Sequence, residues 1–303
     1  MKEIAPFSLP GQFLRGNLHT HTTNSDGMLT LEEVVNKYKN SGYDFLSITD
    51  HFLPSYDFPI TDARPYRTDN FTPLAGVELH APSTASGELW HISAIGIPYD
   101  FSPRLPDEDG PAIARRAAQA GAFITLVHPG WYSLSLDEAE TIEVAHAVEI
   151  YNYGCQIMHD KGHGAYLLDG MLDRGHKLLA TAVDDAHFKS PDFGYAWIEL
   201  KAKSRESEDI LDALKQGHFY STQGPQFHSL AISDEAISVE CSAVQGVLVV
   251  GCGYLHAYKF ATGMTKANIS LEPLASSPWY RVVLLGADGK QAWSNPIWKL
   301  PAS

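Results

Sequence analysis

Short apolar runs alternate with helix-like stretches through the first 225 residues of the chain. Seven of these runs are rich in branched and aromatic residues, which is typical of buried β-strands. They span residues 14–19, 45–49, 74–79, 91–97, 122–127, 148–151 and 178–183. Because strands that alternate with helices form parallel sheets, and seven such units favour closure, the pattern predicts a (β/α)7 barrel.

Capping residues mark the helices between these strands. Thr30, with Glu33 three residues later, forms a capping-box pattern and predicts a helix that ends near Asn40. Pro111 suits the first turn of a second helix, which Gly121 would end. Further helices are predicted at residues 136–145, 160–174 and 206–216.

The pattern changes after Gly217. Residues 226–303 contain short strand-like runs, an Asp288-Gly289 hairpin signal and no helical period. We therefore predict two domains, a barrel at residues 1–225 and a small C-terminal all-β domain at residues 226–303.

The charge balance narrows the choice of partners. The 303 residues include 22 Lys and Arg against 36 Asp and Glu, a formal net charge of −14. Nucleic-acid binding depends on basic residues that neutralise phosphates, so we expect no nucleic-acid partner. A membrane partner is not expected either, because the sequence has no apolar run of about 18 residues. The first ten residues lack a signal-peptide core, and the three cysteines lack the spacing of disulfide or zinc frameworks, so a cytoplasmic protein is predicted.

Histidines are frequent, with 14 in the chain, and many of them adjoin a predicted strand. His19 and His21 lie two positions apart on an extended segment, so both rings point to one side and can hold one ion. Acidic residues accompany the histidines. The strand-associated motifs are His19-Thr20-His21, Ser25-Asp26-Gly27, Thr49-Asp50-His51, Gly76-Val77-Glu78, His91, His128-Pro129 and Asp185-Ala186-His187. Because the working residues of a barrel gather at one end of its strands, these side chains are predicted to converge.

In this order the motifs resemble those of the polymerase-and-histidinol-phosphatase (PHP) family of metal-dependent phosphoesterases, over roughly residues 12–225. The resemblance implies a distorted (β/α)7 barrel with two or three divalent ions. The implied ligands are His19, His21, Glu78 and Asp185 for one ion, Glu78 as a bridge with His91 and His128 for a second, and Asp26, His51 and His187 for a third. Segments 217–222 and 293–298 resemble the two-domain branch of the family, which includes members that act on carbamate esters.

The ligand types agree with this resemblance. Imidazole and carboxylate ligands without thiolate suit Zn, Mn or Fe and do not choose among them. Two such ions can lower the pKa of a bridging water toward about 7 and clamp both oxygens of an in-line displacement. The predicted catalytic residues are Glu78, Asp185, His187 and Asn152. Of these, Asn152 is expected to face the site and hydrogen-bond the substrate, while Asp50 and Asp184 are candidates for orienting a histidine.

Substrate contacts are predicted from the long connection at residues 52–73, which contains four prolines and five aromatic residues without periodicity. A loop of this length is typically a lid or a binding loop, and a plain surface excursion is the alternative. Arg64 and Arg67 in this loop, together with Lys189, are candidate phosphate ligands. The other interpretation is that these three are solvated surface cations.

We therefore predict a metal-dependent hydrolase, most simply a phosphoesterase that acts on a small phosphorylated molecule through a metal-bridging hydroxide. The enzymatic alternative is hydrolysis of a carbamate or amide ester on the same site, where an ion polarises a carbonyl. A third interpretation is a catalytically idle, metal-stabilised binding module that presents the aromatic residues of the β domain. The size of the ligand set argues against idleness, because a structural metal needs only about four ligands.

Overall fold

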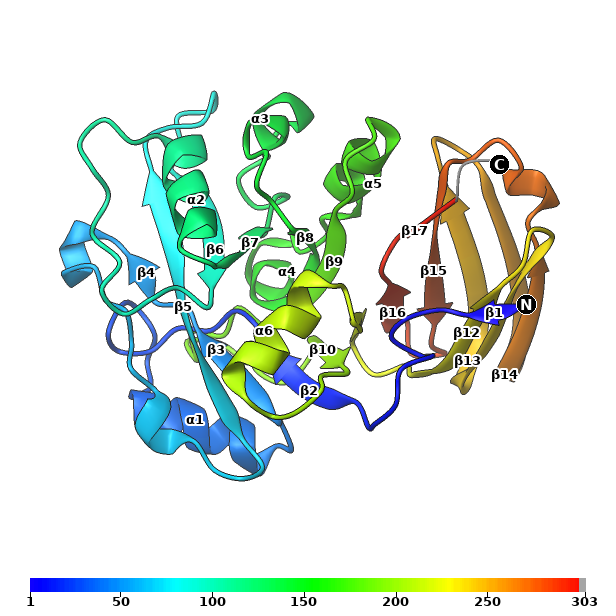
Figure 1. The fold of residues 1–303 in the computed structure, drawn as a ribbon, viewed down its shortest axis with the longest axis horizontal. Helices are drawn as coiled ribbons and strands as arrows, with labels where there is room; N and C mark the ends of the chain where they lie inside the picture. Colours follow the sequence, from blue (N-terminus) through cyan, green and yellow to red (C-terminus); the bar gives the residue numbers. More distant parts are fainter. Residues whose placement is uncertain (300–303) are drawn as a thin grey trace.

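A computed structural model describes residues 1–299, and its strands join into one hydrogen-bonded network within a mixed α/β arrangement (Figure 1). The strands of the α/β part are β2 (Leu14–Asn17), β3 (Phe45–Ile48), β4 (His51–Phe52), β5 (Thr72–Ala81), β6 (Trp90–Ile95), β7 (Phe123–Leu126), β8 (Ala147–Asn152), β9 (Leu179–Val183), β10 (Trp197–Leu200) and β11 (Phe219–Thr222). The helices are α1 (Leu31–Asn40), α2 (Gly110–Gln119), α3 (Leu136–Thr141), α4 (Tyr153–His159), α5 (Ala165–Asp173) and α6 (Ser207–Lys215). None of the helices in this described range is long and apolar enough to cross a membrane.

All seven predicted strands are present, as β2, β3, β5, β6, β7, β8 and β9, and each pairs with the next. One parallel bridge, between Thr20 and Ala186, links the segment after β9 back to the segment after β2. Two backbone hydrogen bonds of 3.0 Å support it, from Asp185 N to His19 O and from His21 N to Ala186 O. Within residues 1–299 the ladder between β9 and β2 is limited to this bridge, so the closed barrel stays a prediction.

The expectation of an all-parallel sheet is wrong for β6. This strand runs antiparallel to β5 on one side and to β7 on the other. The first residues of β6 therefore lie beside the carboxyl ends of the parallel strands. The reversal explains why His91, which begins its strand, can join side chains that follow the other strands.

The two predicted helix starts with capping signals are present. Thr30 and Glu33 form a complete capping box at the start of α1. Pro111 lies in the first turn of α2, and Asp109 caps that helix by accepting a hydrogen bond from Ala112 N. Local side-chain hydrogen bonds thus fix both helix starts.

The helix predicted at residues 160–174 is present as α5 but begins five residues later, at Ala165, and the short helix α4 before it was not predicted. Asp160 takes a left-handed backbone conformation at the end of α4. Gly164 passes so close to β8 that a Cβ there would lie 2.1 Å from the carbonyl oxygen of Glu149. The helical conformation is therefore interrupted between α4 and α5, where the chain passes close to β8. α3 is also shorter than predicted and ends at Thr141.

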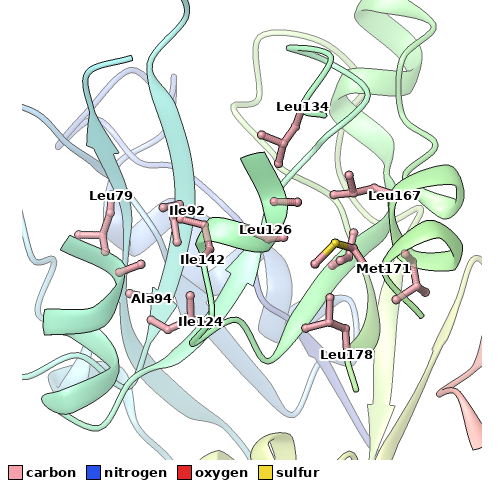
Figure 2. Close-up of a cluster of buried hydrophobic side chains, with 14 of the residues drawn as sticks. Leu79, Ile92, Ala94, Ile124, Leu126, Leu134, Ile142, Leu167, Met171 and Leu178 are labelled. Carbon is pink, nitrogen blue, oxygen red and sulfur yellow. The ribbon is translucent and has the colours of Figure 1, made fainter. Parts of the chain in front are cut away.

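Alternation along the strands separates an apolar face from a polar face. Ile92 pairs with Leu126 and Ala94 pairs with Ile124, and all four belong to the core beneath α2, α3 and α5. Figure 2 shows these side chains with Leu134, Leu167 and Met171, which the helical side contributes. Residues of the opposite parity, such as the paired Glu78 and Ser93, point to the other face. That face carries the polar residues described below.

The C-terminal region is built from strands, as the sequence predicts. They are β12 (Phe227–Ile232), β13 (Ala236–Gly251), β14 (His256–Ser270), β15 (Trp279–Leu285), β16 (Gln291–Ser294) and β17 (Ile297–Trp298), and β1 (Lys2–Glu3) pairs with β12. Figure 1 shows them gathered on the side of the molecule opposite α1 and α2. β11 pairs with both β10 and β16, so hydrogen bonds cross the predicted boundary at residue 225, and the division into two domains stays a prediction.

Candidate metal centre

Glu78 lies at the centre of the histidine cluster and is buried. Its Oε1 lies 2.6 Å from His91 Nδ1 and 3.1 Å from His128 Nε2. Its Oε2 lies 2.8 Å from His51 Nδ1 and 3.6 Å from His19 Nε2. The two oxygens of one carboxylate therefore face different imidazoles, which is the arrangement that a bridging ligand requires.

Asp185 and Asp26 supply the other carboxylates of the cluster. Asp185 Oδ1 lies 3.2 Å from Nε2 of both His19 and His21. Asp26 Oδ1 lies 3.3 Å from Nε2 of both His51 and His187. The structure thus brings together all nine predicted ligands, which are His19, His21, Asp26, His51, Glu78, His91, His128, Asp185 and His187.

Four groups within the cluster have ligand atoms within 4.8 Å of one another: His21, Asp26, His51 and His187; His19, His21 and Asp185; His19, Glu78 and His128; and His51, Glu78 and His80. The second group falls within an implied set, and the first is the implied set of Asp26, His51 and His187 with His21 added. The other two groups combine ligands differently from the implied sets. His21 belongs to two of the groups, and its ring stacks on that of His187 with the ring centroids 4.1 Å apart.

His80 is a member of the cluster that the sequence analysis missed. Its Nδ1 lies 3.1 Å from the carbonyl oxygen of Trp90, and because a carbonyl only accepts, this nitrogen carries the hydrogen. His80 Nε2 is then left 2.9 Å from His51 Nδ1. The signal for it was available: His80 is two residues beyond Glu78 on one strand, so both side chains point to the same face.

A second layer of buried residues holds the ligands in place. Glu149 Oε1 lies 2.7 Å from His19 Nδ1, and Glu149 Oε2 accepts hydrogen bonds from His128 N at 2.7 Å and Asn152 Nδ2 at 2.9 Å. Asn152 Nδ2 also donates to Asp185 Oδ2 at 3.0 Å, while its Oδ1 caps α4 by accepting from Cys155 N. Asn152 is therefore a positioning residue rather than the substrate contact we expected, because both of its amide hydrogens are directed at carboxylates.

Asp50 and Asp184 also have roles different from the predicted one. Asp50 accepts hydrogen bonds from Thr22, Ser25 and Thr61, so it fixes the loop that carries Asp26. Asp184 accepts from the hydroxyl of Tyr38 and from three consecutive backbone amides at residues 194–196. These carboxylates organise loops beside the site and do not orient histidines directly.

The carboxylates of the cluster are held in their ionised form. Burial alone would raise the pKa of Glu78, but the charges of His51 and His91 hold that pKa well below its usual value. Asp185 follows the same pattern, since burial opposes and His19 and His21 favour its low pKa. Anionic oxygens at the centre of the cluster are suited to a divalent cation.

The histidines divide into two groups by protonation. Burial lowers the pKa of His21 to about 3, with His187 and His51 adding to the effect, and burial also lowers the pKa of His91. Burial opposes a high pKa at His51, yet Glu78 and Asp26 raise that pKa to about 10. A cation bound here would replace protons on the second group, because imidazole binds metals in its neutral form.

The donor set fits divalent metal ions. Five buried atoms of the cluster have no hydrogen-bond partner among the described residues: His19 Nε2, His21 Nδ1, Asp26 Oδ1, Glu78 Oε2 and His128 Nδ1. Unpaired buried polar atoms are costly, and four of these five face other ligands of the groups above. Nitrogen and oxygen donors without a thiolate match Zn, Mn or Fe. Cys155 nearby is not a ligand or nucleophile candidate, because burial and the charge of Asp185 raise the pKa of its thiol.

Backbone strain accompanies two of the ligands. The backbone angle φ is 27° at His128 and 53° at Asp185, values that residues other than glycine seldom adopt. Each such residue costs about 1–3 kcal/mol and is retained where the surrounding structure fixes it. The His128 and Asp185 side chains are therefore held in place by the fold at a conformational cost.

A pocket of about 300 Å³ opens over the cluster. It is lined by seven of the predicted ligands and by Trp131, Cys155, Met158, His159 and Lys189. Lys189 Nζ lies 2.7 Å from Asp26 Oδ2, so this predicted substrate contact does reach the site. A larger hollow of about 510 Å³ lies beside α6, but within residues 1–299 no candidate ligand lines it.

Arg64 and Arg67 do not line this pocket within the described part of the chain, which differs from our expectation. The Arg64 guanidinium makes two hydrogen bonds to Asp62, and that of Arg67 makes two to Glu206. Both pairs are largely exposed at the surface. Nearby carboxylates hold the two arginines on the surface, so Lys189 is the predicted cation that lies at the cluster.

The fold and the cluster together define an α/β protein with a histidine- and carboxylate-rich centre at one edge of its strands. Its structure is similar to that of a two-domain protein from Bacteroides vulgatus that contains a predicted PHP-like metal-dependent phosphoesterase. The two share 16% sequence identity with a TM-score of 0.55, and the match covers 89% of each chain. The resemblance to the PHP family is thereby confirmed as a likeness of fold.

An amidohydrolase from Chromobacterium violaceum also aligns, with 17% identity and a TM-score of 0.41, over 57% of this chain and 87% of that one. No protein-family profile matches the sequence. No curated protein sequence matches it either.

Proposed function

We propose that this protein is a metal-dependent hydrolase that cleaves a phosphoester of a small molecule. The observation that carries the proposal is Glu78, a buried carboxylate whose two oxygens face separate sets of imidazoles. A structural metal site closes with about four ligands. Glu78 and nine further candidate ligands, namely the other eight predicted ones and His80, lie in one cluster and support two or three ions and a reactive centre.

The chain would hold Zn, Mn or Fe ions through the histidine and carboxylate groups described above. When bound, such ions polarise the scissile bond and lower the pKa of an attacking water. Lys189, beside Asp26 in the pocket wall, supplies a cation for a phosphoryl oxygen. Glu149 hydrogen-bonds to His19, and Asn152 donates to Asp185, so that both ligands are held in position. A small-molecule substrate suits the size of the pocket.

The test uses protein stripped by a chelator and reloaded with one metal at a time. A 4-nitrophenyl monoester, a bis(4-nitrophenyl) diester and a 4-nitrophenyl carbamate report hydrolysis through the same chromophore. We expect metal-dependent cleavage of a phosphoester that falls by at least about 100-fold in Glu78→Gln. The surface substitution Glu143→Gln is the matched control and should behave as wild type.

Each of the other outcomes would favour a different function or overturn the metal site. Cleavage of the carbamate alone would assign the site to carbamate or amide esters. Tight metal binding without hydrolysis of any class would favour a metal-stabilised binding module. Less than one equivalent of metal after reloading would overturn the metal-centre assignment itself.

A further inference from the structure

One wall of the pocket is formed by residues that are not ligands. Trp131 comes from the loop after β7, and Met158 and His159 form the last turn of α4. The Trp131 ring lies 5.3 Å from that of His91 and 5.5 Å from that of His128. His159 lies beside it, with ring centroids 6.1 Å apart. This Trp131 wall therefore consists of an indole, an imidazole and a thioether side chain, and it adjoins the His91–His128 end of the cluster.

The Trp131 wall reaches the surface although Trp131 and Met158 are large and mainly apolar. Met158 keeps 42% of its surface exposed, and Trp131 is half-buried. The carbonyl oxygen of Trp131 accepts a hydrogen bond from Lys161 Nζ, which fixes the backbone behind the ring. Apolar groups held at the mouth of a polar pocket are typical of a surface that a ligand covers.

Lys189 and Asp26 lie at the other end of the pocket, and Glu78 lies between the two ends. Lys189 pairs with Asp26, which contacts His51 and His187 and not the His91–His128 end. All three carboxylates of the lining, Asp26, Glu78 and Asp185, belong to the ligand cluster. A substrate that spans the pocket therefore meets charge at the cluster and an aromatic surface at the Trp131 wall.

We infer that the substrate is an organophosphate whose non-phosphoryl part is a planar ring, stacked against Trp131 and flanked by Met158. This rests on the proposed function, since it assumes a phosphoryl group at the cluster. A pocket of about 300 Å³ lies at the lower end of small-ligand sites, which fits one ring system rather than a polymer. Methionine sulfur beside an aromatic ring adds a favourable contact.

The test compares two phosphonates that cannot be hydrolysed, phenylphosphonate and cyclohexylphosphonate, by calorimetric titration into metal-loaded protein. They differ in whether the ring is planar, while size and charge are nearly matched. We expect the wild type to prefer the phenyl compound by about 3- to 10-fold. Trp131→Ala should remove the preference without changing metal content, and Trp131→Phe should keep most of it. Tyr254→Ala, which removes an 88% exposed tyrosine elsewhere, is the matched control.

Equal affinities for the two phosphonates in the wild type would overturn the inference and leave the phosphoesterase proposal standing. A preference that survives in Trp131→Ala would also overturn it, and Trp131→Phe provides the comparison if the alanine variant does not fold. Metal-loaded protein that binds neither phosphonate and cleaves no phosphoester would refute the proposed function, and this inference with it.

Discussion

Replacing Glu149 with glutamine tests whether a buried carboxylate behind the cluster sets the state of a metal ligand. Glu149 Oε1 lies 2.7 Å from His19 Nδ1. An ionised carboxylate only accepts, so His19 must carry its hydrogen on Nδ1. That leaves Nε2 free to face Asp185 and Glu78.

The substitution Glu149→Gln keeps the shape but exchanges one acceptor for a donor. The remaining oxygen can serve His128 N and Asn152 Nδ2, which both donate to Oε2 in the wild type. The new amide group then faces His19 Nδ1 and favours the tautomer whose Nε2 carries hydrogen. If the glutamine side chain is flipped, its amide nitrogen instead faces the two donors, His128 N and Asn152 Nδ2. The first orientation keeps the contact but places a hydrogen on the nitrogen that faces Asp185 and Glu78, and the second leaves two buried donors without their acceptor.

The expected loss in metal affinity is about 10- to 100-fold, the usual effect of removing a group that orients a ligand. This corresponds to about 1.4–2.7 kcal/mol of binding free energy. The assay is competition with a chromophoric chelator at fixed pH, with metal content checked by elemental analysis after dialysis. Glu143→Gln, an exposed glutamate on the same segment, controls for the change of one charge. Wild-type affinity in Glu149→Gln would refute the argument that this carboxylate fixes the His19 tautomer.

Three further predictions concern the cluster, the β strands and the response to pH. Glu78→Gln should weaken at least two metal equivalents, whereas Asp26→Asn should weaken one, as measured by stepwise titration of stripped protein. Asp169→Ala should lower the free energy of urea unfolding by about 3 kcal/mol, because it leaves the buried Arg281 guanidinium without its partner. The Arg281 side chain is 7% exposed and makes two hydrogen bonds to that carboxylate, and a change below about 1 kcal/mol would contradict this. Burial, helped by a nearby lysine, lowers the pKa of His146 below 6.5, so the unfolded state binds more protons and stability falls as pH drops below that value. His146→Asn should therefore flatten the loss of melting temperature between about pH 6.5 and pH 5, and an unchanged slope would contradict the assignment.

Local patterns predicted the features that depend on neighbouring residues. The strands were readable because each is a short run of buried branched and aromatic residues. The start of α1 was readable because its capping box lies within four residues. The ligands could be predicted because most of them lie at or just beyond the end of a strand and carry a side chain that binds metal. His80 was missed only because the rule of alternation was not extended past Glu78.

Features that depend on distant partners could not be read in the same way. The surroundings of Arg64 and Arg67 are an example, since Arg67 pairs with Glu206, 139 residues away. Asn152 is another, because its second carboxylate partner is Asp185, which follows a different strand, β9. A side chain that looks available in the sequence is often occupied once the chain folds.

The direction of β6 shows how one such feature changes the chemistry. If β6 ran parallel to its neighbours, His91 would lie at the opposite end of the sheet, about five strand residues or 17 Å from the cluster. The antiparallel pairing of Glu78 with Ser93 and of His80 with His91 instead places His91 beside the end of β5. His91 Nδ1 then reaches Glu78 Oε1 at 2.6 Å, on the side of the carboxylate that also faces His128. The reversed strand therefore supplies the ligand that gives Glu78 its second set of imidazoles, and on that second set rests the proposal of more than one metal ion.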